Sequence, residues 1–73
     1  MMGNTVEVEV KGKKVQMREP KVRDFRVVGN HQSQGELEVH LIANLTGLTV
    51  KELDDLTMKE YTPLQKALEG FQS

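Results

Sequence analysis

Residues 41–61 constrain the fold more than any other part of the chain, because they contain two helix-start signals in close succession. Each signal is a capping box, in which a threonine hydroxyl accepts a hydrogen bond from a backbone N–H one turn into the helix and a glutamate accepts one from the N–H of that threonine. Thr49 is paired with Glu52, and Thr57 is paired with Glu60. Two starts this close leave room for only a short helix between them. The segment is therefore predicted to form a helix, a tight turn, a helix of one or two turns and a further helix.

The helix before the first capping box is predicted at residues 36–46, after a polar loop at residues 30–35. Gly47 follows it as a left-handed C-terminal stop. The apolar face consists of Leu37, Leu41, Ile42 and Leu45, and the opposite face carries Glu36, Glu38, His40 and Asn44. The short third helix should bury Val50, Leu53 and Leu56.

The last helix contains a conflict between its apolar pattern and a proline. The spacing of Met58, Tyr61, Leu64, Leu68 and Phe71 favours one continuous helix. Pro63 occupies the sixth position of that helix, where an interior proline costs about 3 kcal/mol. We therefore predict one turn from residue 58, a kink or break near residue 62 and a main helix over residues 63–71.

The N-terminal part of the chain predicts a β-hairpin. Residues 5–10 alternate strictly, with Val6, Val8 and Val10 on one face, and residues 14–18 resume the alternation with Val15 and Met17 facing inward. Residues 11–13 supply the turn. A short helix is expected over residues 21–28, with Val22, Phe25 and Val28 at helical spacing.

An isolated hairpin is marginally stable in water, so its valine face needs a cover that only the downstream helices can supply. The expected fold class is α+β, with an N-terminal β-hairpin packed on three or four short α-helices. Residues 1–73 are expected to form a single small domain, with the hairpin at about residues 5–18 and the helical part at about residues 21–71.

The residues offer little to an enzyme. There is no cysteine, which removes disulfides, zinc-thiolate sites and thiol nucleophiles. His31 and His40 are expected to face solvent, and the acidic cluster of Glu52, Asp54 and Asp55 to favour a helix start electrostatically. We expect no catalytic residue, no cofactor, no metal and no small-molecule substrate. No leader or membrane-spanning pattern is present in the sequence, so a cytosolic location is expected.

The charge distribution leaves one alternative open. Residues 1–30 carry seven Lys/Arg against four Asp/Glu, whereas residues 31–73 carry three against seven. The basic residues of the first part are Lys11, Lys13, Lys14, Arg18, Lys21, Arg23 and Arg26. They could form a stripe for a small DNA-binding regulatory protein that uses the basic hairpin, and residues 45–67 could be a helix-turn-helix. The final helix lacks the Arg/Asn/Gln cluster that reads base edges, so nucleic acid is the less favoured partner.

The order and spacing of several short motifs resemble a known family, the small tail assembly chaperones of contractile-tailed, Mu-like bacteriophages. The first motif is the strand end Met17-Arg18-Glu19-Pro20 followed by Asp24. The second runs through the helical part as Leu45-Thr46-Gly47-Leu48, Glu52-Leu53, Leu56, Glu60-Tyr61, Leu64, Leu68 and Phe71. Together they cover nearly the whole chain.

The resemblance implies a protein that binds the tape-measure protein in the host cytoplasm and keeps it soluble until the tail tube assembles. It also implies tail-tube protein and self-association as further partners, absence from the mature virion, and a longer frameshifted form. A minor structural tail component is the remaining alternative. An aliphatic groove would suit such a client, and the candidate partner-binding residues are Leu48, Met58, Leu64, Leu68 and Phe71. The alternative for these residues is an ordinary place in the core.

Overall fold

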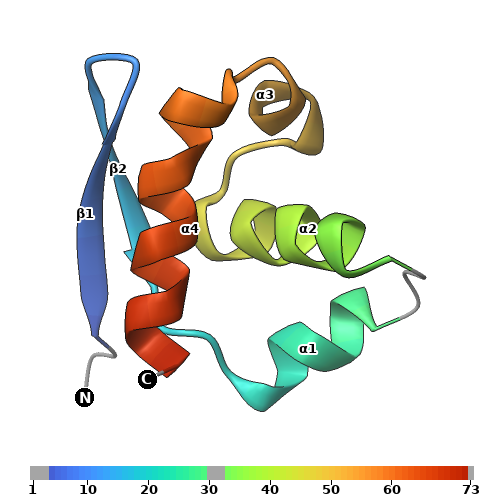
Figure 1. Cartoon of the computed structure of the whole chain (residues 1–73). Coiled ribbons are helices and arrows are strands. Elements are labelled where there is room, and N and C mark those ends of the chain that lie inside the picture. The colour runs from blue at the N-terminus through green and yellow to red at the C-terminus, as the bar shows by residue number, and fades with distance from the viewer. Residues whose placement is uncertain (1–3, 30–32, 73) are drawn as a thin grey trace.

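The computed structural model describes residues 4–29 and 33–72, and within these ranges the chain forms a two-stranded hairpin followed by four helices (Figure 1). The elements are β1 (Thr5–Val10), β2 (Lys13–Arg18), α1 (Val22–Val28), α2 (Gln34–Thr46), α3 (Val50–Asp54) and α4 (Met58–Gln72). The predicted α+β class is confirmed. So are the hairpin, the short third helix between the capping boxes and the helix over residues 21–28, the last with a shift of one residue at its start.

The hairpin is antiparallel, with Thr5 opposite Arg18 and Val10 opposite Lys13. Its turn places Lys11 at φ 53° and Gly12 at φ 77°. Positive φ at both central residues is typical of a type I′ turn, whose twist matches that of the strands. This geometry fixes the register that puts the alternating apolar residues on one face.

Three of the predicted inward residues of the hairpin, Val8, Val10 and Met17, are buried, and Val15 is partly buried. Val6 is an exception, because it remains exposed although its spacing places it on the same face. It lies toward the open end of the hairpin, where α4 also ends (Figure 1). Met17, opposite Val6 on β2, is completely buried, so the exposure of the apolar face at this end is confined to β1.

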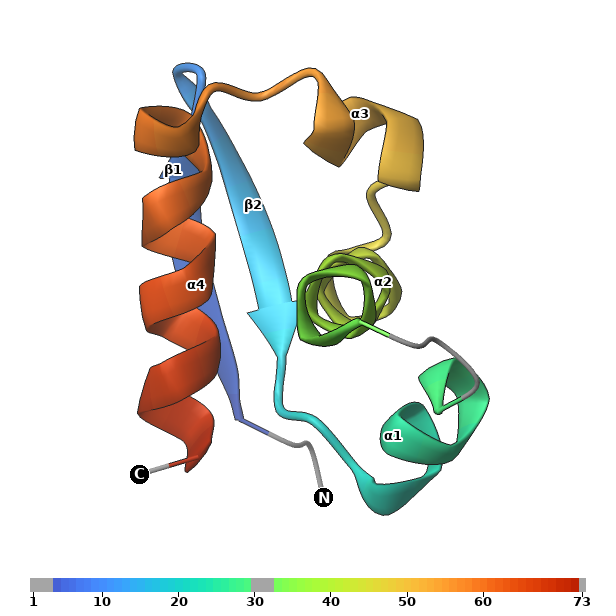
Figure 2. The same cartoon turned by 45° about the vertical axis from the view of Figure 1, so that its right-hand side comes forward.

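The helices cover the hairpin in two directions. α4 packs along β1, and α2 packs against β2 and crosses the strands, so that Figure 2 shows it nearly end-on. α1 and α3 both pack on α2 rather than on the sheet. The shared core consists of Val8, Val10, Met17, Leu41, Ile42, Leu45, Leu53, Tyr61, Leu64 and Leu68.

The predicted break in the last helix is wrong, because α4 runs without interruption through Pro63. Tyr61, Leu64 and Leu68 are all buried on one side of it, and only a continuous helix can keep them there. Pro63 itself is exposed, so the carbonyl of Lys59 that loses its intrahelical donor lies on the solvent side. Burial of the stripe therefore outweighs the cost of one proline.

The helix ends follow the local signals closely. The Thr49 Oγ1 atom accepts from the Glu52 N–H at 3.0 Å, and the Thr57 Oγ1 atom accepts from the Glu60 N–H at 3.2 Å, which confirms both capping boxes. Gly47 ends α2 at φ 82°, as predicted.

One helix start was missed from the sequence. α2 begins two residues before its predicted start, because the Ser33 hydroxyl accepts from the Glu36 N–H at 3.1 Å. The last two residues of the predicted loop at residues 30–35 therefore belong to α2. Residues 30–32 of that loop lie outside the described part of the chain.

Candidate partner-binding surface

α1 is oriented in a way that its apolar pattern does not predict. Val22 and Phe25 have helical spacing and share a face, yet Val22 is 78% exposed and Phe25 is also exposed. The residue that α1 buries is Asp24, with only 2% of its surface accessible. The apolar residues at helical spacing therefore do not mark the buried face of this helix.

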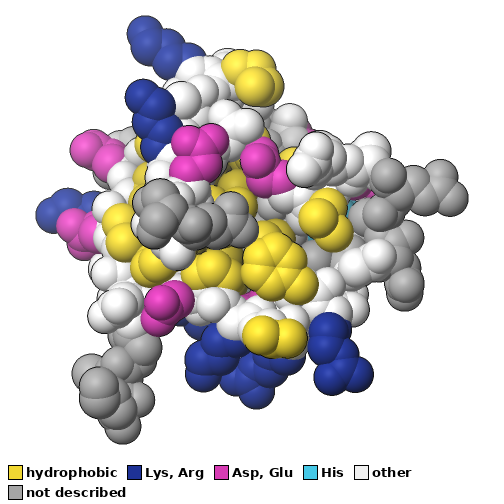
Figure 3. All heavy atoms as spheres, turned by 60° about the horizontal axis from the view of Figure 1, so that its bottom comes forward, with side chains coloured by type: hydrophobic (Ala, Val, Ile, Leu, Met, Phe, Trp, Pro, Cys, Tyr) yellow, Lys and Arg dark blue, Asp and Glu magenta, His cyan; other side chains and the backbone are white. Residues whose placement is uncertain are grey.

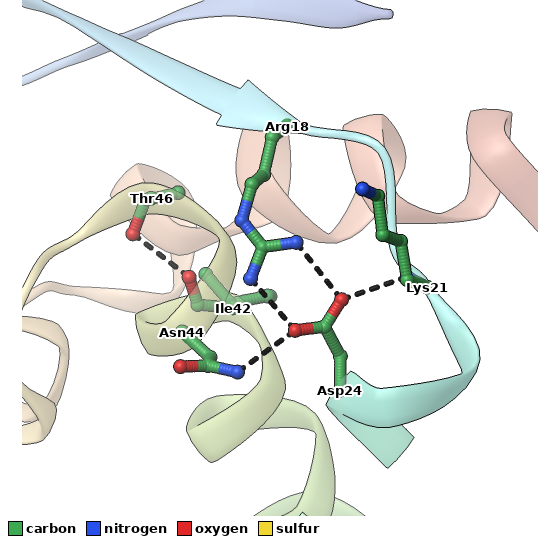
Figure 4. Close-up of polar contacts among 6 residues, drawn as sticks. All are labelled: Arg18, Lys21, Asp24, Ile42, Asn44 and Thr46. Atoms are coloured by element: carbon green, nitrogen blue, oxygen red, sulfur yellow. Dashed lines mark hydrogen bonds and ion pairs between the residues drawn. The ribbon is translucent and has the colours of Figure 1, made fainter. Parts of the chain in front are cut away.

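Asp24 is buried because its carboxylate is fully occupied (Figure 4). The two guanidinium nitrogens of Arg18 donate to its two oxygens at 2.9 and 2.7 Å. The backbone N–H of Lys21 donates to Oδ2 at 2.7 Å, and the Asn44 side-chain amide donates to Oδ1 at 3.0 Å. One carboxylate therefore ties together the end of β2, the start of α1 and the last turns of α2.

The charges in this cluster stabilise one another. The hydrogen bond from Arg18 is the main reason that the pKa of Asp24 falls to about 2, against the opposing effect of burial. The same hydrogen bond raises the pKa of Arg18. Among the described residues, every buried side-chain nitrogen or oxygen has a hydrogen-bond partner, so α1 is positioned by a satisfied polar cluster rather than by apolar packing. We call Arg18, Asp24 and Asn44 the Asp24 clamp.

The clamp leaves apolar side chains of α1 available at the surface. Of the five large hydrophobic residues that are exposed in the described part, three lie on α1: Val22, Phe25 and Val27. Val22 and Phe25 are three residues apart and share one face, whereas Val27 lies on another side of the helix. Figure 3 shows the end of the molecule that carries α1, with hydrophobic side chains gathered near its centre and Lys and Arg side chains along one edge.

A hollow of about 420 Å³ lies beside Phe25, between α1, α2 and α4. Its lining consists of Phe25, Gln34, Gly35, Leu37, Glu38, Leu41, Gln65 and Leu68. We call this hollow together with Val22 the α1 groove. Its floor is aliphatic, and its polar rim includes Glu38, whose Oε1 accepts from the Tyr61 hydroxyl at 2.8 Å and from Gln65 Nε2 at 3.0 Å.

Those two hydrogen bonds link α2 to α4 across the groove. Burial first, and the Glu38 hydrogen bond second, raise the pKa of Tyr61 above its usual range. The tyrosine therefore stays a neutral donor, and the shape of the groove is held by hydrogen bonds as well as by packing.

The five residues proposed from the sequence are not brought together in one surface. Leu64 and Leu68 are buried in the core, although Leu68 also lines the α1 groove, and Phe71 is partly buried. Met58 is 70% exposed at the start of α4, the end away from α1 in Figure 1. Leu48 is partly buried beside a second hollow of about 260 Å³ between the hairpin turn and α3. Binding by any of the five stays a prediction.

Val22 and Phe25 were not among the candidate binding residues predicted from the sequence. A signal was present in Arg18 and Asp24, two opposite charges on either side of the proline that ends the strand. A carboxylate at the third position of a helix can bind the N–H of the capping residue and a strand-end arginine at once. Had that pair been assigned to the interior, the valine and phenylalanine of α1 would have been expected outside.

The other titratable candidates have structural places. Glu52 caps α3, and hydrogen bonds from Thr49 lower its pKa, while Asp54 and Asp55 are exposed. His40 is partly buried on α2, and His31 lies outside the described residues. Within residues 4–29 and 33–72 no group of three or more histidine or acidic side chains could hold a metal ion. No helix in these ranges is long and apolar enough to cross a bilayer.

Comparison with known protein families gives a match over nearly the whole chain. A family model described as "Phage tail assembly chaperone proteins, E, or 41 or 14" matches residues 3–73, which span the hairpin, the Asp24 clamp and all four helices. No curated protein and no solved structure matches the chain.

Proposed function

The chain belongs to the phage tail assembly chaperone family, and from this premise we propose that it binds the tape-measure protein and keeps it soluble until the tail tube assembles. A chaperone of this family assists the assembly of phage tails, so it is a binding protein and not an enzyme, its partners are tail proteins, and it acts in the host cell. The more specific proposals are an action in the host cytoplasm, absence from the mature virion, and one domain over residues 1–73.

The observation that carries the proposal is the exposure of Val22 and Phe25 beside the aliphatic floor of the α1 groove. A monomer gains nothing by leaving these side chains in water, because full burial of one such side chain contributes about 1.5–3 kcal/mol. The Asp24 clamp holds them outward at the cost of that burial. A hydrophobic partner surface would recover it.

The size of the surface suits a reversible chaperone. Two exposed side chains and a shallow hollow give only a few kcal/mol before the entropy of association is subtracted, so a single contact would be weak. A tape-measure protein is a long chain, and many copies bound weakly along it could be displaced one by one as tube subunits polymerise. Met58, Phe71 and Leu48 do not line this groove, so binding by them stays a separate prediction, whereas Leu64 and Leu68 would act through the shape of its floor.

The alternative of a DNA-binding regulator has less support. Arg18, one of the seven residues of the proposed basic stripe, is engaged by Asp24. The groove beside α1 also contains the Glu38 carboxylate, which would repel phosphate.

Co-expression tests the proposal. The tape-measure protein of the same phage is produced with wild-type chain, with a Val22→Ser/Phe25→Ser variant, or with Met58→Ser as a matched change at an exposed apolar residue elsewhere. We expect the wild type and Met58→Ser to raise the soluble fraction of the tape-measure protein and the double variant to raise it much less. No gain in solubility with the wild type would contradict the proposed function. Loss with Met58→Ser alone would move the site to the start of α4.

A further inference from the structure

We propose that the α1 groove accepts an amphipathic helix with acidic flanks, so that the segments of the tape-measure protein bound here carry carboxylates beside their apolar stripe. The inference rests on the proposed function and specifies the chemistry of the partner. The juxtaposition that carries it is an exposed apolar pair, Val22 and Phe25, with exposed cations at the N-cap and on the surface of the same short helix.

The cations lie at the start of α1 and on its surface. Arg26 follows Val22 by four residues within α1, so it lies on the helix surface next to Val22. Lys21 is the N-cap residue, in extended conformation, and directly precedes Val22. Both cations are exposed. Arg23 is also exposed, farther around the helix. A partner helix that lays its apolar residues on Val22 and Phe25 would bring flanking side chains to Arg26 and to the start of α1, which Lys21 precedes.

The exposed face of α1 and its N-cap is positive because the clamp removes the only carboxylate of α1 from it. Asp24 is buried and neutralised by Arg18, so the exposed part of residues 21–28 carries three cations and no anion. The remainder of the chain differs, since residues 31–73 have an excess of acidic residues. Complementary charges at an interface rim set partner choice and association rate more than affinity, and here they select acidic flanks.

The shape and the rim of the groove favour a protein helix over a phosphate-bearing partner. Leu41, at the floor, is almost completely buried, and a flat lipid surface would not reach it. Glu38 of α2 places a carboxylate in the lining, which disfavours any anionic group over the floor, so the carboxylates of the partner are expected beside α1 and phosphate-bearing partners are disfavoured in the hollow. The amides of Gln34 and Gln65 on the same rim can bind polar groups of a peptide. The hollow is smaller than a helix of about 10–12 Å diameter, so it would receive side chains from one.

Two synthetic helical peptides test the inference directly. They share one apolar stripe at i, i+3, i+4 and i+7, and differ only in having Glu or Lys at the flanking positions. Binding is measured by fluorescence anisotropy at about 50 mM and about 300 mM salt, where screening differs strongly. We expect the Glu-flanked peptide to bind about tenfold more tightly at low salt, and less than that at high salt, because exposed ion pairs contribute modestly and are screened.

Two variants with the same change in net charge locate the effect. Lys21→Glu/Arg26→Glu reverses the cations beside the groove, and Lys59→Glu/Lys66→Glu reverses two exposed lysines of α4. The first should abolish or invert the preference for the Glu-flanked peptide, and the second should retain it. Circular dichroism and thermal unfolding verify that each variant is folded. If the double change destabilises α1, Arg26→Glu alone replaces it in the test, and this variant is expected to reduce the preference for the Glu-flanked peptide.

The inference is overturned by equal binding of the two peptides, by preference for the Lys-flanked peptide, or by equal loss in both charge variants. Tighter binding of duplex DNA or of phosphatidylglycerol vesicles than of the Glu-flanked peptide would also overturn it. Failure of the proposed function is distinct, because it is scored by the solubility of the intact tape-measure protein. Wild-type chain that solubilises that protein while showing no charge preference would leave the function standing and remove this inference alone.

Discussion

α4 and α1 are held in the structure by opposite means. α4 buries a stripe of Tyr61, Leu64 and Leu68 against the hairpin and continues without interruption through a proline. α1 buries a carboxylate and leaves Val22 and Phe25 at the surface. The first helix contributes its apolar residues to the stability of the fold, whereas the second keeps them free for another molecule.

The difference shows how a chain of 73 residues can present apolar surface without losing its fold. A small domain has few large apolar residues, and withholding two of them from the core weakens it. The Asp24 clamp compensates with charge-assisted hydrogen bonds, which position α1 by geometry that apolar contacts alone would not fix. If this comparison is right, changes in α4 should affect the whole fold and changes in the clamp should affect α1 first.

The largest effect should come from Leu64→Ala. Leu64 is completely buried, and truncation removes its transfer free energy and leaves a cavity, at a cost of about 3 kcal/mol. Urea unfolding monitored by circular dichroism measures the loss. Val22→Ala is the matched control and should change the free energy of unfolding by less than about 0.5 kcal/mol. Similar losses in the two variants would show that α1 and α4 are not held differently.

Asp24→Asn should cost about 2 kcal/mol, because it removes a buried charge partner and places an amide donor against the donors of Arg18 and Asn44. The cost is limited because the Arg18 side chain is 39% exposed and can turn to water. Native-state hydrogen exchange should show amides of α1 losing protection before those of α4. Equal loss of protection in both helices would mean that the clamp stabilises the fold globally.

The same carboxylate predicts that part of the free energy of unfolding is lost in acid. The pKa of Asp24 is lowered from 3.8 to about 2, so its contribution is present above pH 3.8 and is lost as the pH falls toward 2. The shift corresponds to about 2 kcal/mol of unfolding free energy. Urea midpoints measured between pH 5 and pH 2 for wild type and Asp24→Asn should converge at the acidic end. If the urea midpoints of wild type and Asp24→Asn change in parallel with pH, ionised Asp24 does not contribute this part of the stability.

The parts of the fold that were predictable are those whose signals are local. A capping box, a strict alternation of valines and a glycine at a helix end each specify their structure within a few residues, and Thr49, Thr57 and Gly47 all behave as predicted. The Ser33–Glu36 start of α2 was equally local and was missed within a polar segment that resembled a loop. The Ser33 cap is nevertheless a local signal of the same kind as the caps at Thr49 and Thr57.

The orientation of α1 and the continuity of α4 depend on partners distant in sequence. Asp24 turns inward because Asn44, twenty residues away, and Arg18 in another element complete its hydrogen bonds. Pro63 is tolerated because Leu64 beside it is buried by residues of the hairpin and α2. Helical spacing can show which residues share a face, but not which face is turned to the core when a satisfied carboxylate competes with a valine.

Pro63→Ala should increase stability by about 1 kcal/mol. Alanine restores the N–H that can donate to the Lys59 carbonyl and removes the clash of the ring, while part of the gain is offset because the unfolded chain becomes more flexible. Thermal unfolding measures the change, and Gln65→Ala is not a suitable control because Gln65 binds Glu38. Lys66→Ala, at an exposed position of the same helix, is the better one. Destabilisation by Pro63→Ala would mean that the bend imposed by proline is itself needed for packing on β1.

The smallest change in stability should come from a pair of exposed valines on α1. Val22 and Val27 are 78% and 69% exposed, so Val22→Ser and Val27→Ser should each shift the free energy of unfolding by less than about 0.5 kcal/mol. The two lie on different sides of the helix, and only Val22 shares a face with Phe25 at the groove. Solubilisation of the tape-measure protein should therefore fall with Val22→Ser and persist with Val27→Ser. The two substitutions are in the same helix and make the same chemical change. An equal effect of both on solubilisation would mean that α1 contributes general hydrophobicity and no defined binding surface. The contrast between α1 and α4 would then concern stability alone.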